Sequence, residues 1–164
     1  MRYIALLLFA MMSVALTYAQ YQANSAIPNA QVVNVASAAT QFLNYRSAVM
    51  SFMTANPSFI GNISATQLAP YNHGFSSTFT SQYAAGNAVT SIGSGYEVTV
   101  YAALPSGSLQ VLIQQTGDDI SIGVSAGSTW TSKAVGSGVV SAAQPLNTSL
   151  ALAGDIVSVF ESGN

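Results

Sequence analysis

Two stretches near the start of the chain carry clear hydrophobic patterns. Residues 3–19 form a nearly unbroken apolar run. Residues 30–55 place apolar side chains on one side of a helical wheel and small polar ones on the other, which predicts an amphipathic helix. Asn56-Pro57 ends this helix, because the residue before a proline disfavours helical geometry. The apolar side consists of Val35, Ala38, Phe42, Tyr45, Val49, Phe52 and Met53.

The second half of the chain carries the alternation that is typical of strands. Residues 96–103 alternate apolar with polar positions, which predicts a strand with one face on the core. Residues 107–116 have apolar positions at helical spacing before Gly117, which predicts a short helix, with a strand as the alternative. Shorter strands are expected around residues 120–124, 129–134, 138–142 and 155–160.

The segment between these two regions, residues 57–95, is rich in loop-forming residues. Ser64 and Gln67 have the spacing of a capping box, which predicts the start of a short helix that Pro70 ends. Residues 76–85 are interpreted as an irregular strand. A helix followed by a sheet indicates an α+β fold, in which the amphipathic helix packs on a small antiparallel sheet.

The apolar run at residues 3–19 directs the chain to a membrane. As a helix it would measure ~26 Å, which is near the lower limit for spanning a bilayer and also suits the core of a signal peptide. Arg2 favours an N-terminus that stays in the cytoplasm. We therefore interpret residues 1–19 as a transmembrane anchor or signal peptide, residues 20–29 as a linker, and residues 30–164 as an exported α+β domain.

The composition excludes several classes of function. Charged residues make up 5% of the chain and the net charge is −2, so a basic surface for nucleic acid is excluded. The chain has no cysteine, which removes disulfides and thiolate metal sites. A surface with so few charged residues suits a domain that works within an assembly, and equally a slightly acidic exported domain.

Arg46 is unusual because it lies within the apolar side of the predicted helix. A lone basic residue in this position usually packs its stem and extends its head to water, and we favour this arrangement. The alternative is a partly buried ion pair with one of the five carboxylates, which would fix how the helix docks. Arg46, Phe42, Tyr45 and Trp130 are the candidate structural or interaction residues.

No residue pattern makes a convincing active site. Gly123-Val-Ser125-Ala-Gly127 matches the nucleophile elbow of hydrolases in its letters, but His73 precedes the serine, and we interpret the segment as a turn. His73 with Asp118 and Asp119 lacks the further ligands of a metal site. Lys133 is interpreted as a solvated lysine. We therefore expect no enzymatic activity, no cofactor, no metal and no small-molecule substrate.

The order of several short segments resembles a known family. They are Phe42-Leu-Asn-Tyr-Arg-Ser-Ala-Val49, Asn56-Pro-Ser-Phe-Ile-Gly61, Ile63-Ser-Ala-Thr-Gln-Leu68, Tyr96-Glu-Val-Thr-Val-Tyr101, the loop from Leu104 to Leu109, Thr116-Gly-Asp-Asp-Ile-Ser-Ile-Gly-Val124 and Gly154-Asp-Ile-Val-Ser-Val159. Together they resemble the PilM family of type IVb and conjugative thin-pilus systems, which is distinct from the actin-like cytoplasmic protein of the same name. The resemblance carries over no functional residue.

The resemblance implies a single-pass protein of the bacterial inner membrane, with its C-terminal domain in the periplasm. Its expected role is that of a non-enzymatic, protein-binding scaffold in pilin transport or the basal body of the pilus. The expected partners are the membrane and other envelope proteins of pilus assembly. Two alternatives remain open: a secreted or surface-exposed minor pilus subunit or adhesin, and a small periplasmic serine hydrolase that uses Ser125.

Overall fold

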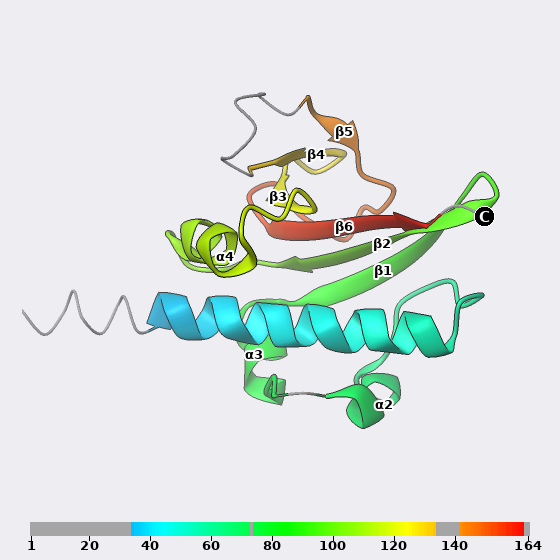
Figure 1. The fold of residues 1–164 in the computed structure, drawn as a ribbon, viewed down its shortest axis with the longest axis horizontal. Coiled ribbons are helices and arrows are strands. Elements are labelled where there is room, and N and C mark those ends of the chain that lie inside the picture. Colours follow the sequence, from blue (N-terminus) through cyan, green and yellow to red (C-terminus); the bar gives the residue numbers. More distant parts are fainter. Residues whose placement is uncertain (1–33, 73, 134–141, 163–164) are drawn as a thin grey trace, which may run out of the picture. The chain divides into compact units, whose positions relative to one another are not determined.

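One antiparallel sheet organises the domain, in the strand order β1-β2-β6-β3-β4-β5 (Figure 1). The computed structural model describes residues 34–72, 74–133 and 142–162. The chain divides into two units, Met1–Asn34 and Val35–Asn164, and all of the strands belong to the second. The strands are β1 (Gly86–Ile92), β2 (Gly95–Ala102), β3 (Ile122–Ser125), β4 (Thr129–Ser132), β5 (Gln144–Pro145) and β6 (Ile156–Ser162).

A long helix, described over residues 34–55, covers one face of this sheet (Figure 1). The amphipathic pattern predicted it, and the helix is confirmed over the described residues, with Phe42 and Val49 fully buried. It ends before Asn56, whose main-chain N–H and side-chain amide both donate to the Phe52 carbonyl. The buried residues that join helix and sheet include Ala39, Phe42, Val49, Met53, Val89, Val98, Val100, Ala102 and Ile156. The α+β class is confirmed by this arrangement.

The opposite face of the sheet is covered as well. Trp130, Leu146, Ala151, Val157 and Val159 form a second buried cluster, to which residues 146–153 contribute a loop. The sequence predicted a strand with one face on the core, and therefore the other face in water. In the structure this loop covers the second face of β2 as well.

Glu97 and Thr99, on the polar face of β2, are each 1% exposed. The Glu97 carboxylate accepts hydrogen bonds from the Thr99 hydroxyl and from the main chain and side chain of Asn147. The carboxylate therefore ties the covering loop to the sheet.

The region predicted as loops contains more structure than the pattern indicated. The capping box is confirmed: the Ser64 hydroxyl accepts from the Gln67 N–H at the start of α2 (Ala65–Leu68), which continues as the 3₁₀ helix η1 (Ala69–Tyr71). The irregular strand at residues 76–85 is wrong, because α3 (Ser77–Gln82) occupies that segment. Ser76 caps α3 by accepting from the Phe79 N–H, and the burial of Phe79 holds the helix in place. Strand β1 lies in the same region and was not predicted.

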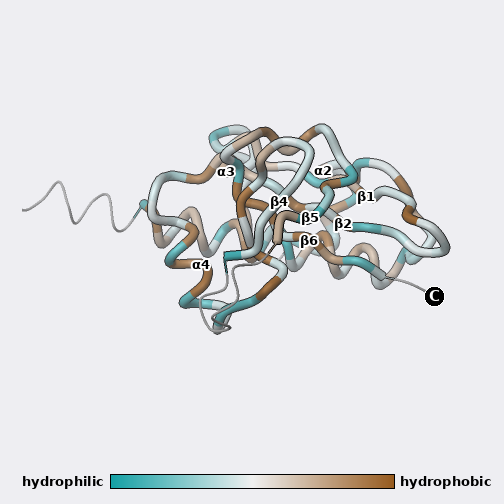
Figure 2. Tube along the Cα trace, turned by 90° about the horizontal axis from the view of Figure 1, so that it is seen from above, coloured by the Kyte–Doolittle hydropathy of each residue, from teal (hydrophilic) through white to brown (hydrophobic). Residues whose placement is uncertain are grey.

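Later elements follow the sequence pattern closely. Helix α4 (Ser108–Thr116) is confirmed, and it ends at Gly117 in the left-handed conformation (φ 65°) that favours glycine. Hydrophobic and hydrophilic residues alternate along α4 in Figure 2. Strands β2, β3, β4 and β6 match predicted segments. The strand expected at residues 138–142 lies largely outside the described residues, as does the apolar run at residues 3–19. Among the helices that the structure describes, none has the length and apolarity needed to cross a membrane.

Candidate functional site

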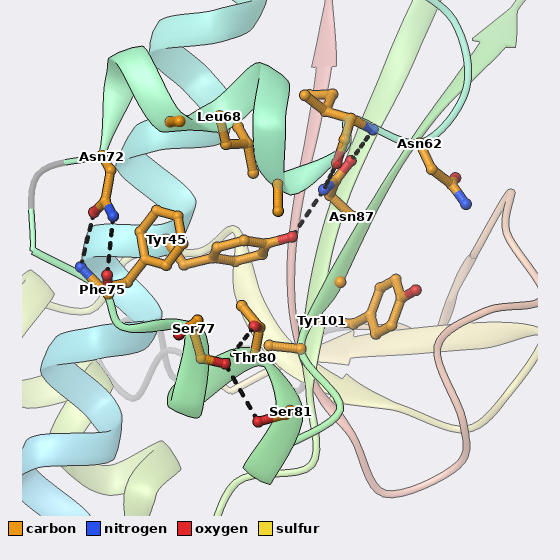
Figure 3. A pocket seen from close by; sticks show the side chains of 15 residues that line it. Tyr45, Asn62, Leu68, Asn72, Phe75, Ser77, Thr80, Ser81, Asn87 and Tyr101 are labelled. Atoms are coloured by element: carbon orange, nitrogen blue, oxygen red, sulfur yellow. Dashed lines mark hydrogen bonds between the residues drawn. The ribbon is translucent and has the colours of Figure 1, made fainter.

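A cleft of about 530 Å³ lies between the short helices α2 and α3. Figure 3 shows Leu68 of α2 on one wall, Thr80 and Ser81 of α3 on the other, and Tyr45 of the long helix between them. Asn87 of β1 completes the floor, and the Tyr45 hydroxyl points toward it. We call this pocket the α2–α3 cleft. Its size falls in the range of pockets that hold a ligand or a segment of a partner.

Asn87 links three parts of the fold at the bottom of the cleft. Its side-chain carbonyl accepts from the Ile63 N–H (2.7 Å), and its amide donates to the Ile63 carbonyl (3.0 Å) and to the Tyr45 hydroxyl (2.8 Å). The side chain pairs with both main-chain groups of Ile63, as a neighbouring strand would. Because Asn87 is 4% exposed, these bonds form away from bulk water.

Tyr45 is the functional candidate of the sequence analysis that lines the cleft. It is 4% exposed and packs edge-on against Phe75, with ring centroids 5.0 Å apart. Burial raises the pKa of the Tyr45 phenol, and the nearby Tyr101 adds to this effect, while the hydrogen bond from Asn87 opposes it. The hydroxyl therefore stays protonated at neutral pH. It accepts from Asn87, and its own proton has no acceptor among the described residues.

None of the described residues that line the cleft carries a charge. The described residues that line it are tyrosine, phenylalanine, leucine, isoleucine, alanine, glycine, asparagine, serine and threonine. Tyr101 closes one end by lying against Gly86, where a Cβ atom would come within 2.4 Å of the Tyr101 hydroxyl. A site of this kind cannot compensate the lost hydration of a charged ligand, so it favours a neutral one.

Arg46 forms a second polar site, on another side of the long helix. Its guanidinium lies 2.6 Å from the Asp119 carboxylate and 3.2 Å from the Ser121 hydroxyl, and it sits over the Phe160 ring at 4.5 Å. The arrangement that we favoured, with the head in water, is therefore wrong. The physical reason is that the turn before β3 brings a carboxylate to the helix, and the Arg46 side chain is 15% exposed.

Asp119 is held in its charged form at this site. Burial alone would raise the pKa of its carboxyl, but hydrogen bonds from Ser121 and Arg46, together with the charge of Arg46, lower it below the ordinary value of 3.8. The ion pair joins the long helix to the segment that leads into β3. The geometry is that of a structural contact between two elements.

The remaining candidates lie in the core or in turns. Phe42 is fully buried and Trp130 is 5% exposed in the second cluster, so neither side chain offers a contact surface. Ser125 is 3% exposed, and its hydroxyl donates to the Ala151 carbonyl and accepts from the Gly127 N–H in a strand-to-strand turn. A nucleophile elbow needs a strand followed by a helix, which this segment does not form.

The candidate metal ligands do not come together in the described part of the chain. His73 lies outside the described residues, and within them no group of three or more His, Cys, Asp or Glu side chains could hold an ion. Lys133 is exposed. The sequence analysis missed Asn87, because an asparagine before a short alternating stretch carries no signal of its partners.

Comparisons with known proteins are consistent with one another. Residues 9–159 match the family described as PilM. A crystal structure of a protein described as PilM from Escherichia coli B7A has a similar fold, with a TM-score of 0.51 and 15% sequence identity. The similarity covers 79% of this chain and 94% of that chain, and at this identity it concerns the fold alone. The search among curated proteins found no significant match.

Proposed function

The chain belongs to the PilM family, and we propose that it serves pilus assembly as a non-enzymatic, protein-binding scaffold at the bacterial inner membrane. The family is the one of the type IVb and conjugative systems, not the actin-like protein of the same name. In this proposal the apolar N-terminal run holds the protein at the membrane, and the α+β domain in the periplasm binds another envelope protein. Confinement to a membrane raises the effective concentration of both partners.

The observation that supports a binding role is the uncharged α2–α3 cleft. Its walls come from the long helix, the short helices α2, η1 and α3, and strands β1 and β2. They present apolar surface around a few buried polar groups, as binding sites for proteins and small ligands do. The site has no pair of carboxylates and no nucleophile beside a base among its described residues. The buried Ser125 adds support, because substrate could not reach its hydroxyl without movement of the turn.

A gene deletion tests the proposed role. We expect cells without the gene to lose pili in electron micrographs, and a plasmid copy of the full chain to restore them. Normal pilus number and length in the deletion strain would contradict the proposal. Sheared pili should not contain the protein, since its presence there would favour a minor pilus subunit.

Cell fractionation tests the proposed location. We expect the full-size protein to stay with the inner membrane after osmotic shock and after washing with high salt. A shortened protein released by osmotic shock would contradict the membrane anchor and leave the scaffold role to the deletion experiment.

A further inference from the structure

The edge of β1 is open at the floor of the α2–α3 cleft. The N–H and C=O of Val89 both bond to Gly61, so the main-chain groups of Val89 point away from β2. Directions alternate along an antiparallel strand, and the main-chain groups of Asn87 therefore point the same way. The segment opposite leaves the edge after Gly61, whose φ is +115°, and Ile63 bonds to the Asn87 side chain instead.

This geometry leaves buried polar groups without partners. The main-chain N–H and C=O of Asn87 form no hydrogen bond with another described residue. The hydrogen bonds from this part of β1 to β2 come from the residues on either side of Asn87. The proton of the Tyr45 hydroxyl also lacks an acceptor among the described residues. More than nine in ten buried main-chain groups are paired in native proteins, so a cluster of this kind indicates a bound molecule or water.

The unpaired N–H and C=O of Asn87 are groups of the kind that bind the main chain of a peptide. A donor and an acceptor on one residue of a strand edge match the N–H and C=O of one residue in an extended chain, as in strand addition. The cleft beside them offers the partly exposed Phe75 and Ala85 to an apolar side chain of that peptide. No charged residue lines the cleft among the described ones, so the charge pattern matches an uncharged segment.

We propose that the open edge of β1 and the α2–α3 cleft together bind an extended, uncharged peptide segment of a partner protein. One residue of the segment pairs with the main chain of Asn87, and a neighbouring apolar side chain enters the cleft. The carbonyl of the segment nearest Tyr45 accepts the phenolic proton. This inference rests on the proposed scaffold function and assigns its contact site.

A binding experiment with defined peptides tests the proposal. The full chain, with ¹³C-labelled alanine and leucine methyl groups, is titrated in detergent micelles with acetyl-Ser-Val-Leu-Val-Ser-amide. We expect saturable shifts of the methyl groups of Ala65, Leu68, Ala69 and Ala85, which line the cleft. A peptide with glutamate in place of the leucine should bind at least tenfold more weakly, because its charge enters a neutral site. A peptide N-methylated at both valines should weaken to a similar extent, because the residue that pairs with Asn87 neighbours the leucine and loses its main-chain donor.

A matched pair of variants controls this measurement. Ala65→Trp fills the cleft from α2, whereas Thr66→Trp places the same side chain on a neighbouring exposed residue that does not line it. Ser81→Trp fills the cleft from the opposite wall. Unchanged methyl signals of the buried Ala48 and Ala102 report that each variant is folded. The two filling variants should lose the saturable shifts and Thr66→Trp should keep them.

Three results would overturn the proposal. The first is that the filling variants bind the leucine peptide as well as Thr66→Trp does. The second and third are that the N-methylated peptide or the glutamate peptide binds as tightly as the leucine peptide. The same variants separate this inference from the scaffold role in cells. If the deletion strain lacks pili and Ala65→Trp restores them as well as Thr66→Trp does, the cleft is not the contact site although the scaffold role stands. If the deletion strain has normal pili, the scaffold role itself fails.

Discussion

Replacing Asn87 by leucine tests whether one buried amide holds the cleft together. Leucine branches at Cγ as asparagine does and is somewhat bulkier, so the change removes hydrogen bonds without opening a cavity. The Ile63 N–H and C=O lose their partners and the Tyr45 hydroxyl loses its donor. These three groups lie on two segments and are buried, since Ile63 and Tyr45 are each 4% exposed.

The expected loss of stability follows from these bonds. Each buried group left without a partner costs about 1–3 kcal/mol, so the two main-chain groups of Ile63 together cost roughly 4 kcal/mol. The loss of the Tyr45 bond adds about 1 kcal/mol. Burial of the leucine side chain returns up to about 2 kcal/mol. The net prediction is a decrease of about 3 kcal/mol in the free energy of unfolding.

Urea unfolding of the full chain in micelles measures this change. The chain has a single tryptophan, and Trp130 is 5% exposed in the folded protein, so its fluorescence reports unfolding. With a slope of about 2 kcal/mol per molar urea, the expected loss lowers the midpoint by about 1.5 M. Tyr45→Phe is the matched control, because it removes one of the three bonds and should cost about 1 kcal/mol. A loss below about 1 kcal/mol for Asn87→Leu would refute the assigned role of the amide.

Two further predictions concern other contacts. Arg46→Met leaves the Asp119 carboxylate without its cation and should destabilise the protein by about 1–3 kcal/mol at pH 7, measured by the same unfolding assay. Because the folded-state pKa of Asp119 lies below 3.8, the stabilisation by its charged carboxylate is complete above that pH and is lost as the pH falls through the folded-state pKa. The free energies of unfolding of the unchanged protein and of Asp119→Asn should therefore approach each other in acid. A difference that stays constant with pH would contradict the ion pair. Gly123→Ala should cost about 2–4 kcal/mol, because its Cβ would lie 2.1 Å from the main-chain oxygen of Thr131, whereas Gly86→Ala meets a side chain that can rotate and should cost less. Equal thermal midpoints for the two glycine variants would contradict this reasoning.

Elements with a strong local signal could be predicted from the sequence. The long helix has a continuous apolar side, and α4 has both its spacing and Gly117 as a C-cap. The α2 capping box depends on two residues three positions apart, Ser64 and Gln67. In each case the decisive interactions lie within one or two helical turns, so the pattern of neighbouring residues contains them.

Elements that depend on distant partners could not be predicted in the same way. Strand β1 is held by β2 and by Gly61, and the burial of Glu97 depends on a loop 50 residues later in the chain. The partner of Arg46 is 73 residues away, and the sequence offered five carboxylates of equal standing. Helix α3 was mistaken for a strand because its polar residues show no clear period, and the burial of Phe79 against the long helix decides its form.

The cleft and the ion pair depend on the same turn of the long helix. Tyr45 and Arg46 are neighbours in the chain and about 100° apart around the helix axis, so one reaches Asn87 on β1 while the other reaches Asp119 before β3. A rotation of the helix by one residue would break both contacts at once. The two polar contacts, about 100° apart on one turn, therefore fix the rotation of the helix on the sheet, and with it the position of the Tyr45 hydroxyl on the floor of the cleft. Loss of the distant ion pair should accordingly loosen the cleft floor as well as lower the overall stability.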